Sequence, residues 1–283
     1  MADGSVMSAA IENERIKTHA AVTGRGSPLQ RYQEVIVGRP GLGRLLHFEL
    51  CLWLGSLPGA VGLALRKLLW PRLFGSCGRG VLFGSGVVLR HPHRIHLGDR
   101  VVIGEGCVLD ARSDGSDRGI AFGDDVILST AVVVSAKCAS IEVGPRSGFG
   151  PHSVIVTTDG NSVRIGADVA VGPHSVIVGG GNYHTERLDV PIWRQGIRPG
   201  HHVALGDDIW LGAGVRVLGG SRIDDGSIVA AGAVVKGEFG PGTIAAGVPA
   251  RAIRTRTDRP AGGPDQGAPA PPREPATKGR VPA

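Results

Sequence analysis

Residues 205–235 read LGDDIWLGAGVRVLGGSRIDDGSIVAAGAVV. An aliphatic residue returns at every sixth position of this stretch, at Leu205, Leu211, Val217, Ile223, Val229 and Val235. A small or β-branched residue follows four places after each of the first five, at Ile209, Val215, Ser221, Ser227 and Ala233. Neither an α-helix nor an ordinary strand has a period of six. A short fixed repeat predicts a solenoid, in which successive coils stack and bury one another's faces.

The repeat extends upstream and is grouped in threes. The earlier groups are Leu97, Ile103, Leu109; Phe122, Leu128, Val134; Val143, Phe149, Ile155; and Ile165, Val171, Ile177. Three repeats per coil predict a three-sided prism that begins near Val81 and ends at Arg254. The interruptions, near residues 111–121, 140–142, 161–164 and 183–204, all follow the third member of a group. We therefore expect every insertion to leave from the same corner of the prism.

Composition agrees with this fold class and disfavours several functions. The chain has 283 residues, of which 46 are Gly and only 4% are aromatic, as narrow coils with tight corners require. The formal net charge is +6, but the Arg residues are scattered without interleaved aromatics, which argues against nucleic-acid binding. None of the four Cys residues forms a CxxC pair, so neither a zinc knuckle nor a disulfide framework is predicted. Cysteine usage and the lack of a signal peptide in residues 1–27 favour a cytoplasmic location.

Four segments are predicted along the chain: a disordered N-terminus (1–27), a helical segment (28–80), the β-helix (81–254) and a disordered tail rich in Pro, Gly and Ala (255–283). Helices are expected over 28–37, 44–54 and 60–70. The apolar stretch 44–70 needs a partner, which could be the end of the solenoid or the inner face of a membrane through peripheral contact. Packing on the solenoid is favoured because these segments lack a strong basic face.

Two parts of the sequence resemble the hexapeptide-repeat acyltransferases, and in particular the galactoside, maltose and polysaccharide O-acetyltransferases. One is the repeat itself, GDDIWLGAGV at 206–215 and IVAAGA at 228–233; the other is the closing motif AGVPARAIR at 246–254. The resemblance covers about residues 80–254. It implies a left-handed parallel β-helix, although the general crossover rule predicts the opposite hand. It also implies a homotrimer that binds acetyl-CoA in the groove between neighbouring subunits.

The longest insertion carries the candidate catalytic residue. It begins GGGNYH at 179–184, and in enzymes of similar sequence a His at the mouth of this loop is the general base. Acetylation of a hydroxyl requires removal of its proton, and His is the side chain whose ordinary pKa suits that transfer. We therefore predict that His184 is the base; the alternative is an exposed loop His without a role. Asp189, Glu186 or a backbone carbonyl could orient its ring.

The acceptor and the coenzyme should contact other residues of the repeat and the loop. Candidates for the acceptor site are Asn182, Tyr183, Asp189 and His152. The resemblance places Ala213 and Ala231 along the pantetheine arm and Trp210 at the acyl pocket, although these could equally be small corner residues and a packing Trp. Lys236, Arg251 and Arg254 occupy positions where relatives place cations near the coenzyme phosphates. Relatives often have Thr-Lys or Thr-Arg where this chain has Lys236-Gly237.

A repeated heptad suggests one alternative chemistry. GPHSVIV occurs at 150–156 and again at 172–178, which places His152 and His174 on successive coils. Stacked imidazoles are typical of the γ-class carbonic anhydrases, which share this fold and use three His residues per zinc. No third His has a ladder position here, so no metal site is predicted. The sequence thus predicts an acetyl-CoA-dependent O-acetyltransferase acting on a sugar, glycan precursor or related small molecule. A zinc hydratase and a non-catalytic scaffold are the alternatives.

Overall fold

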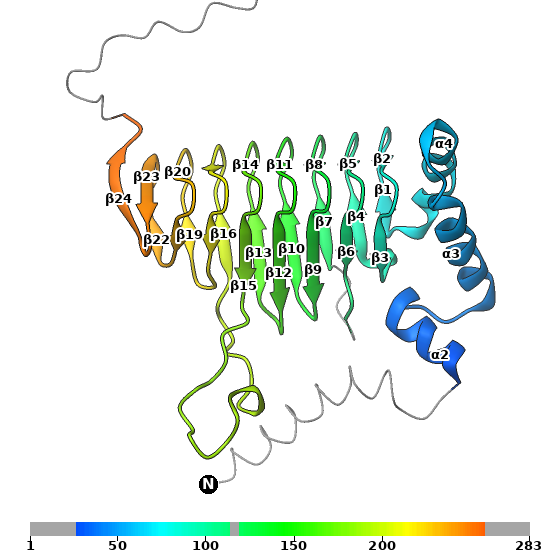
Figure 1. The fold of residues 1–283 in the computed structure, drawn as a ribbon, viewed down its shortest axis with the longest axis horizontal. Helices are drawn as coiled ribbons and strands as arrows, with labels where there is room; N and C mark the ends of the chain where they lie inside the picture. Colours follow the sequence, from blue (N-terminus) through cyan, green and yellow to red (C-terminus); the bar gives the residue numbers. More distant parts are fainter. Residues whose placement is uncertain (1–26, 114–118, 258–283) are drawn as a thin grey trace, which may run out of the picture.

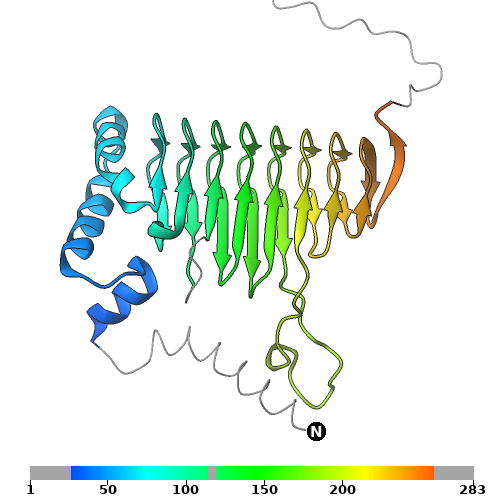
Figure 2. The ribbon, with the colours of Figure 1, turned by 180° about the vertical axis from the view of Figure 1, so that it is seen from behind.

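The structure is a parallel β-helix with three helices at one end (Figure 1). It is a computed structural model that describes residues 27–113 and 119–257. The disorder predicted for the two chain ends therefore falls almost wholly outside the described residues. Seen from behind, the coils stack side by side along the whole solenoid (Figure 2).

Three parallel sheets form the sides of the prism. Sheet A contains β1 (Ser76–Cys77), β4 (Ile95–Leu97), β7 (Ile120–Phe122), β10 (Ser140–Val143), β13 (Ser162–Ile165), β16 (Val203–Leu205), β19 (Arg222–Ile223) and β22 (Glu238–Phe239). Sheet B contains β2 (Leu82–Phe83), β5 (Val102–Ile103), β8 (Ile127–Leu128), β11 (Gly148–Phe149), β14 (Ala170–Val171), β17 (Trp210–Leu211), β20 (Ile228–Val229), β23 (Thr243–Gly247) and the antiparallel β24 (Ala250–Thr255). Sheet C contains β3 (Val88–Arg90), β6 (Val108–Asp110), β9 (Val133–Lys137), β12 (Val154–Thr158), β15 (Val176–Gly179), β18 (Arg216–Val217) and β21 (Val234–Val235).

The grouping of the repeat in threes is confirmed, because the three members of each group lie on sheets A, B and C in turn. Leu205, Leu211 and Val217 belong to β16, β17 and β18, and all three are buried. Parallel strands stack these residues directly on their counterparts one coil away, as Ile165 does on Leu205. The core is therefore a column of aliphatic side chains along the prism axis, which explains why few aromatic residues are needed.

Acidic side chains at the corner between sheets A and B connect the coils. Asp124 Oδ1 accepts a hydrogen bond from the backbone N–H of Asp99 at 2.8 Å. Further along the solenoid, Asp207 Oδ1 accepts from Ala167 N–H at 2.7 Å, and Asp225 Oδ1 accepts from Asp207 N–H at 2.8 Å. The acidic residues that follow the aliphatic repeat thus satisfy backbone donors that the turn leaves unpaired.

The insertions leave from the corner between sheets C and A, as expected, but two of them are strands. Residues 140–142 belong to β10 and residues 162–164 to β13, whereas the sequence placed interruptions there. The extra residues lengthen β9 and β12 to five residues each, so that these coils are wider and carry no long loop. The spacing of the repeat shows that residues have been added, but it does not show whether they form a strand or a loop.

The N-terminal segment is helical where the sequence predicts it. The helices are α2 (Pro28–Tyr32), continued by a π-helical turn (Gln33–Val37), then α3 (Leu42–Gly55) and α4 (Gly59–Leu69), followed by a 3₁₀ turn (Trp70–Leu73). Ser27 caps α2 through its hydroxyl, which accepts from Gln30 N–H. The first solenoid strand, β1, precedes the start expected near Val81. Its Gly-rich surroundings hide the six-residue spacing.

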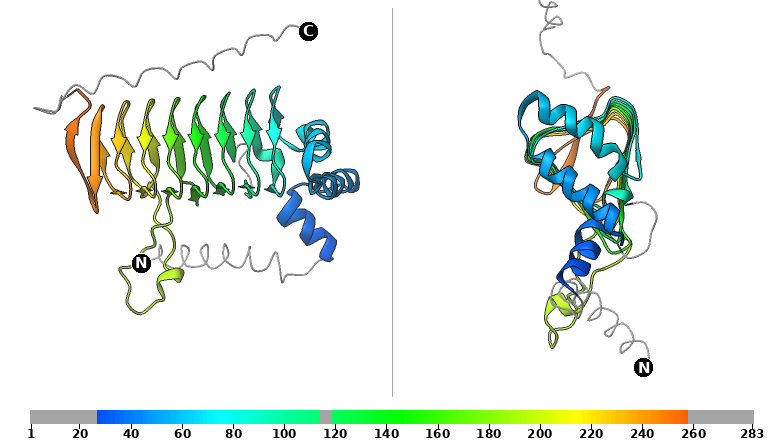
Figure 3. Two further views of the ribbon diagram at one scale, coloured as in Figure 1. Left: turned by 45° about the horizontal axis from the view of Figure 1, so that its top comes forward. Right: turned by 90° about the vertical axis from the view of Figure 1, so that its right-hand side faces the viewer.

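The helices pack across the first coil and cover its open end (Figure 3). Trp70 lies 5.3 Å from Phe83 between ring centroids, and its indole N–H donates to Cys51 O at 3.0 Å. Packing of residues 44–70 on the solenoid is thereby confirmed. No described helix is long and apolar enough to cross a bilayer.

Candidate active site

The longest loop joins β15 to β16 at residues 180–202 and projects away from the prism (Figure 1). Its two arms pair at the base. His184 N–H donates to Gly196 O at 2.9 Å, Arg198 N–H donates to Asn182 O at 2.7 Å, and Tyr183 forms an antiparallel bridge with Ile197. His184 therefore lies on a hydrogen-bonded stem and not on the free part of the loop.

A buried glutamine that the sequence analysis did not identify holds the remainder of the loop. The Gln195 side-chain amide donates to Arg187 O at 2.6 Å and to Val190 O at 2.9 Å. Its carbonyl oxygen accepts from Arg187 N–H at 3.0 Å. These bonds close the outer part of the loop on itself, which fixes the stem from the other side. A single Gln inside an irregular segment gives no periodic signal from which this could be predicted.

Glu186 is the carboxylate beside His184. The His184 side chain is 34% exposed, and its Nδ1 lies 3.4 Å from Glu186 Oε2. Glu186 also forms an ion pair with Arg198 across the stem. A carboxylate beside Nδ1 favours the tautomer that carries its proton there, which leaves Nε2 with a free lone pair. Of the orienting groups that the sequence left open, the geometry favours Glu186.

Asp189 is engaged elsewhere. Its Oδ2 lies 2.6 Å from Arg187 Nη2, and this guanidinium holds the pKa of the Asp189 carboxyl below its usual value. Asn182 and Tyr183 are exposed on the stem next to His184. The loop thus presents one imidazole, one amide and one phenol within three consecutive residues.

Trp210 lies in a row of side chains on the outer face of sheet B. It pairs in register with Ala170 on one side and Ile228 on the other, and the row continues through Ile244 to Arg254. At roughly 4.8 Å per strand, three steps place the Trp210 and Arg254 backbones about 14 Å apart. Arg251 lies on the same terminal strand, where its side chain is also exposed.

The corner between sheets B and C brings Ala213 and Ala231, two of the predicted coenzyme residues, close to the paired histidines. Gly232 N–H donates to Ala213 O at 2.8 Å, and Gly214 N–H donates to Pro173 O at 2.9 Å. Equivalent turn positions on successive coils therefore stack in columns along the solenoid. One column contains Pro173, Ala213 and Ala231. The adjacent column contains His152, His174, Gly214 and Gly232. The φ values of this second column are all positive, between 57° and 71°.

The two imidazoles of that corner stack as the repeated heptad predicts. The rings of His152 and His174 lie 5.0 Å apart between centroids, with an interplanar angle of 7°. Catalytic zinc sites normally use three protein ligands. Within residues 27–113 and 119–257, no group of three or more His, Cys, Asp or Glu side chains could hold a metal ion.

The predicted site residues thus lie at different corners of one protomer. His184 leaves from the corner between sheets C and A, where Lys236 is also exposed after β21. Ala213, Ala231 and His152 lie at the corner between B and C. The width of sheet C separates these two corners. On the coil that contains β15, the four residues of that strand make this width roughly 13 Å. One protomer alone does not bring the base and the small-residue corner together.

Comparison with known proteins finds relatives that are named as acetyltransferases, although no family model matches the chain. It is 43% identical over 70 residues to an acetyltransferase-named protein of Schizosaccharomyces pombe, covering 25% of this chain and 34% of that protein. The chain spans about a third of the length of this and a Saccharomyces cerevisiae relative.

A longer match is found in Escherichia coli K12, to a protein named for lipopolysaccharide biosynthesis O-acetyl transfer. It is 30% identical over 168 residues, which cover 59% of this chain and 74% of the relative. Among solved structures, a hexapeptide-repeat acetyltransferase of Vibrio cholerae with acetyl coenzyme A is 20% identical, with a TM-score of 0.39 over 80% of this chain and 98% of the other. The extent of the Escherichia coli match, together with the three-sided solenoid and its closing motif, shows that this chain belongs to the hexapeptide-repeat acyltransferase family.

Proposed function

We propose that this protein is an O-acetyltransferase that moves the acetyl group of acetyl-CoA to a hydroxyl of a sugar, a glycan precursor or a related small molecule. The observation that carries the proposal is the position of His184, held on a paired stem with Glu186 3.4 Å from its Nδ1. Family membership supports acetyl-CoA as the donor.

The residues of the stem suit a direct transfer. His184 Nε2 accepts the hydroxyl proton while the acceptor oxygen attacks the thioester carbonyl carbon. The C–S bond then breaks, and the imidazolium returns the proton to the departing thiolate. Glu186 stabilises the imidazolium and keeps the ring oriented, as the third member of a catalytic triad does. No Ser or Cys nucleophile with an adjoining base is needed, because the acceptor itself attacks.

A second copy of the chain would complete this site. The outer row of sheet C is apolar along most of its length, since Val88, Val108, Val133, Val154 and Val176 are in register. The matching row of sheet A is polar, with His96, Glu142, Arg164 and Arg222. Burying the valine row in a homotrimer would leave sheet A facing solvent. It would also allow the His184 loop of one subunit to approach the small-residue corner of its neighbour.

Within that groove, the residues divide by chemistry. Ala213 and Ala231 leave room for the pantetheine arm, and Trp210 forms a wall near the acyl group. Lys236, Arg251 and Arg254 supply positive charge for the coenzyme phosphates. Asn182 and Tyr183, which directly precede His184, hold the acceptor hydroxyl by hydrogen bonds. Asp189 and His152 complete the acceptor contacts, and the Escherichia coli relative's name supports a sugar hydroxyl as the acceptor class.

The decisive experiment is the His184→Ala variant. We expect acetyl-CoA-dependent transfer to fall by about 10²–10⁴-fold, because general-base catalysis contributes that much. CoA release in the presence of a panel of sugar acceptors measures the rate. Glu186→Gln should lower kcat by less and leave the KM for acetyl-CoA unchanged, because it removes only the charge behind the ring.

Two outcomes would contradict the proposal. Turnover of the His184→Ala variant at the wild-type rate would exclude His184 as the base. Failure of the wild-type protein to bind any CoA thioester in calorimetry would favour a scaffold role instead. Thr185→Ala is the matched control, since the Thr185 side chain is exposed on the same loop and should leave the rate unchanged.

A further inference from the structure

The three helices α2, α3 and α4 at the end of the solenoid form what we call the helical cap. This cap is apolar on the side that faces away from the solenoid. Leu45, Phe48 and Cys51 of α3 are buried against the rest of the protein. The opposite side of α3 carries Leu42, Leu46, Leu50 and Trp53, spaced four, four and three residues apart, and α4 adds Val61 and Leu68. We call these six side chains the outer stripe.

The six side chains of the outer stripe are between 46% and 75% exposed. Leu46 is 61% exposed and Trp53 is 75% exposed. Scattered single apolar residues are normal on a surface, but a contiguous group marks a contact with another protein or with a membrane. Bulky aliphatic residues with Trp on one side of a short helix are typical of helices that lie in a membrane interface.

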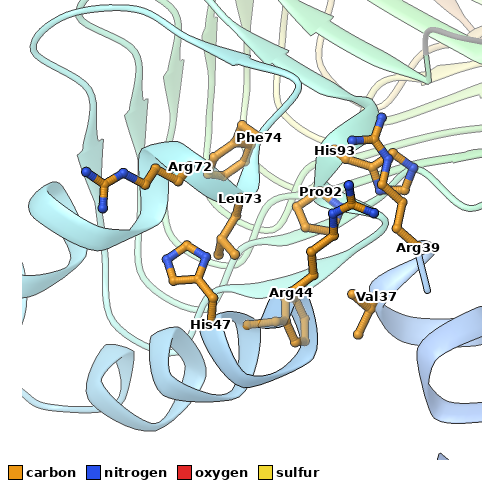
Figure 4. Close-up of a pocket in the computed structure, with 10 residues that line it drawn as sticks. Val37, Arg39, Arg44, His47, Arg72, Leu73, Phe74, Pro92 and His93 are labelled. Carbon is orange, nitrogen blue, oxygen red and sulfur yellow. The ribbon is translucent and has the colours of Figure 1, made fainter. Parts of the chain in front are cut away.

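A cationic pocket lies on the other side of α3, between this helix and the first coils (Figure 4). Arg39, Arg44 and His47 line it from the helical segment, Arg72 from the 3₁₀ turn, and His93 from the solenoid. In Figure 4 the Arg44 and His47 side chains point from α3 toward the same space as the His93 and Arg39 side chains. The three Arg side chains come from separate segments of the chain, which is why the sequence shows no basic face.

The charges of the pocket lack acidic partners within the part of the chain that the structure describes. No carboxylate there lies within ion-pair distance of Arg39, Arg44 or Arg72; Arg44 donates only to the Pro40 carbonyl, at 3.2 Å. Burial is the main reason that the pKa of His93 is lowered to about 4, and the positive charge of Arg39 beside it is the second. Positive potential therefore accumulates in the pocket, and an anion would relieve it.

We propose that the helical cap binds the surface of a bilayer that contains anionic lipids, with the outer stripe in the acyl boundary and the cationic pocket at the headgroup phosphates. An interfacial helix buries its apolar side about 5–10 Å deep, which leaves the opposite side at headgroup level. Residues 28–75 contain six Lys and Arg but only two Glu, which matches the negative surface of such a membrane.

Charge favours a membrane over a second protein copy as the occupant. A second copy docked on the outer stripe would bring its own Arg39, Arg44 and Arg72 to the same end of the solenoid, and like charges would repel. Glu49, at the border of the outer stripe, is already engaged, since it accepts a hydrogen bond from the Tyr32 hydroxyl at 2.5 Å. The cap sits at the end of the solenoid opposite β24, so a membrane there leaves all three sheets accessible (Figure 1).

Co-sedimentation of the full chain with vesicles tests this inference. We expect binding to vesicles of phosphatidylcholine mixed with phosphatidylglycerol and little binding to phosphatidylcholine alone. Each of Arg39→Gln, Arg44→Gln and Arg72→Gln should weaken binding about fivefold, because one cation near an anionic surface contributes about that factor. Leu46→Glu combined with Trp53→Glu should abolish binding, and both side chains are exposed enough to be replaced without unfolding.

Matched variants control for charge and for apolar exposure. Arg79→Gln removes a side chain that is 96% exposed near the same end but lies outside the pocket, and it should leave vesicle binding unchanged. Ile253→Glu changes an apolar residue of matching exposure, 64%, at the far end, and should also have no effect. Circular dichroism of each variant verifies the fold. The readout needs neither acetyl-CoA nor an acceptor, so it is independent of the His184 result.

Three results would overturn the proposal. One is equal binding to both vesicle types that is insensitive to the Arg variants. Another is a lack of vesicle binding together with concentration-dependent association that Leu46→Glu and Trp53→Glu abolish, which would assign the outer stripe to a second copy. The last is vesicle binding that is lost on removal of residues 1–26, which would assign it to that segment.

Discussion

A few single residues connect the helical cap to the solenoid, and their burial lowers the pKa of two histidines at this contact. Gly38 has a φ of 78°, and a Cβ at this position would lie 2.5 Å from the His91 ring. His91 in turn binds the cap, because its N–H donates to Ile36 O at 2.9 Å and its Nε2 lies 2.9 Å from Glu34 O. His91 and the nearby His93 are both buried where the solenoid meets the cap, and this burial lowers the pKa of both imidazoles.

The His93 environment predicts a pH dependence of stability. Its pKa is about 4 in the folded protein, against about 6.5 in an unfolded chain. The unfolded state therefore binds more protons between these two values, so the free energy of unfolding should fall as pH decreases from about 6.5 to 4. His93→Gln should make the decrease of Tm over this window shallower. An unchanged slope in thermal melts would show that His93 does not cause it.

At the scale of elements, one buried cation joins α4 to the first coil. Arg66 and Lys67 lie in the last turn of α4, where cations interact favourably with the helix dipole. Arg66 is also buried, and its guanidinium donates to Phe83 O at 2.8 Å, Gly55 O at 2.7 Å and Leu57 O at 2.9 Å. It therefore clamps α3, α4 and β2 together.

Loss of this clamp should destabilise the cap. Arg66→Ala leaves three carbonyl groups without their donor, and we expect the free energy of unfolding to decrease by about 2–4 kcal/mol, since each such loss costs about 1–3 kcal/mol and effects overlap. Lys67→Ala is the neighbouring control; its side chain is exposed, so its effect should stay within about 0.5 kcal/mol. Urea unfolding followed by Trp fluorescence measures both. Equal stability of the two variants would contradict the clamp.

At the scale of the whole molecule, the valine row of sheet C predicts where copies of the chain meet. Val154→Glu places a charge in the middle of this row, and we expect the mass in solution to fall from that of a trimer to that of a monomer. Light scattering after size-exclusion chromatography provides the measurement. Ala121→Glu, in the outer row of the polar sheet A, should not change the mass. A trimer that tolerates Val154→Glu would place the contact on another side.

The proposed trimer and the proposed membrane contact would use different parts of the molecule, so they could coexist. The valine row runs along sheet C on one side of the prism. The helices that carry the outer stripe lie across the end of the prism (Figure 3). Copies packed side by side would present their helical caps together. Such a multivalent face would bind a bilayer more strongly than one cap does.

The six-residue period by itself determined the prism, its three sides, the stacking of His152 on His174 and the corner from which the His184 loop leaves. It could do so because each coil repeats the same local contacts, so that spacing in sequence translates directly into position in space. Only the tertiary structure decided which carboxylate lies beside His184, that Arg66 is buried, and that Arg39, Arg44 and Arg72 share one pocket. Those arrangements join residues from irregular segments or separate elements, and no periodic pattern encodes contacts of that kind.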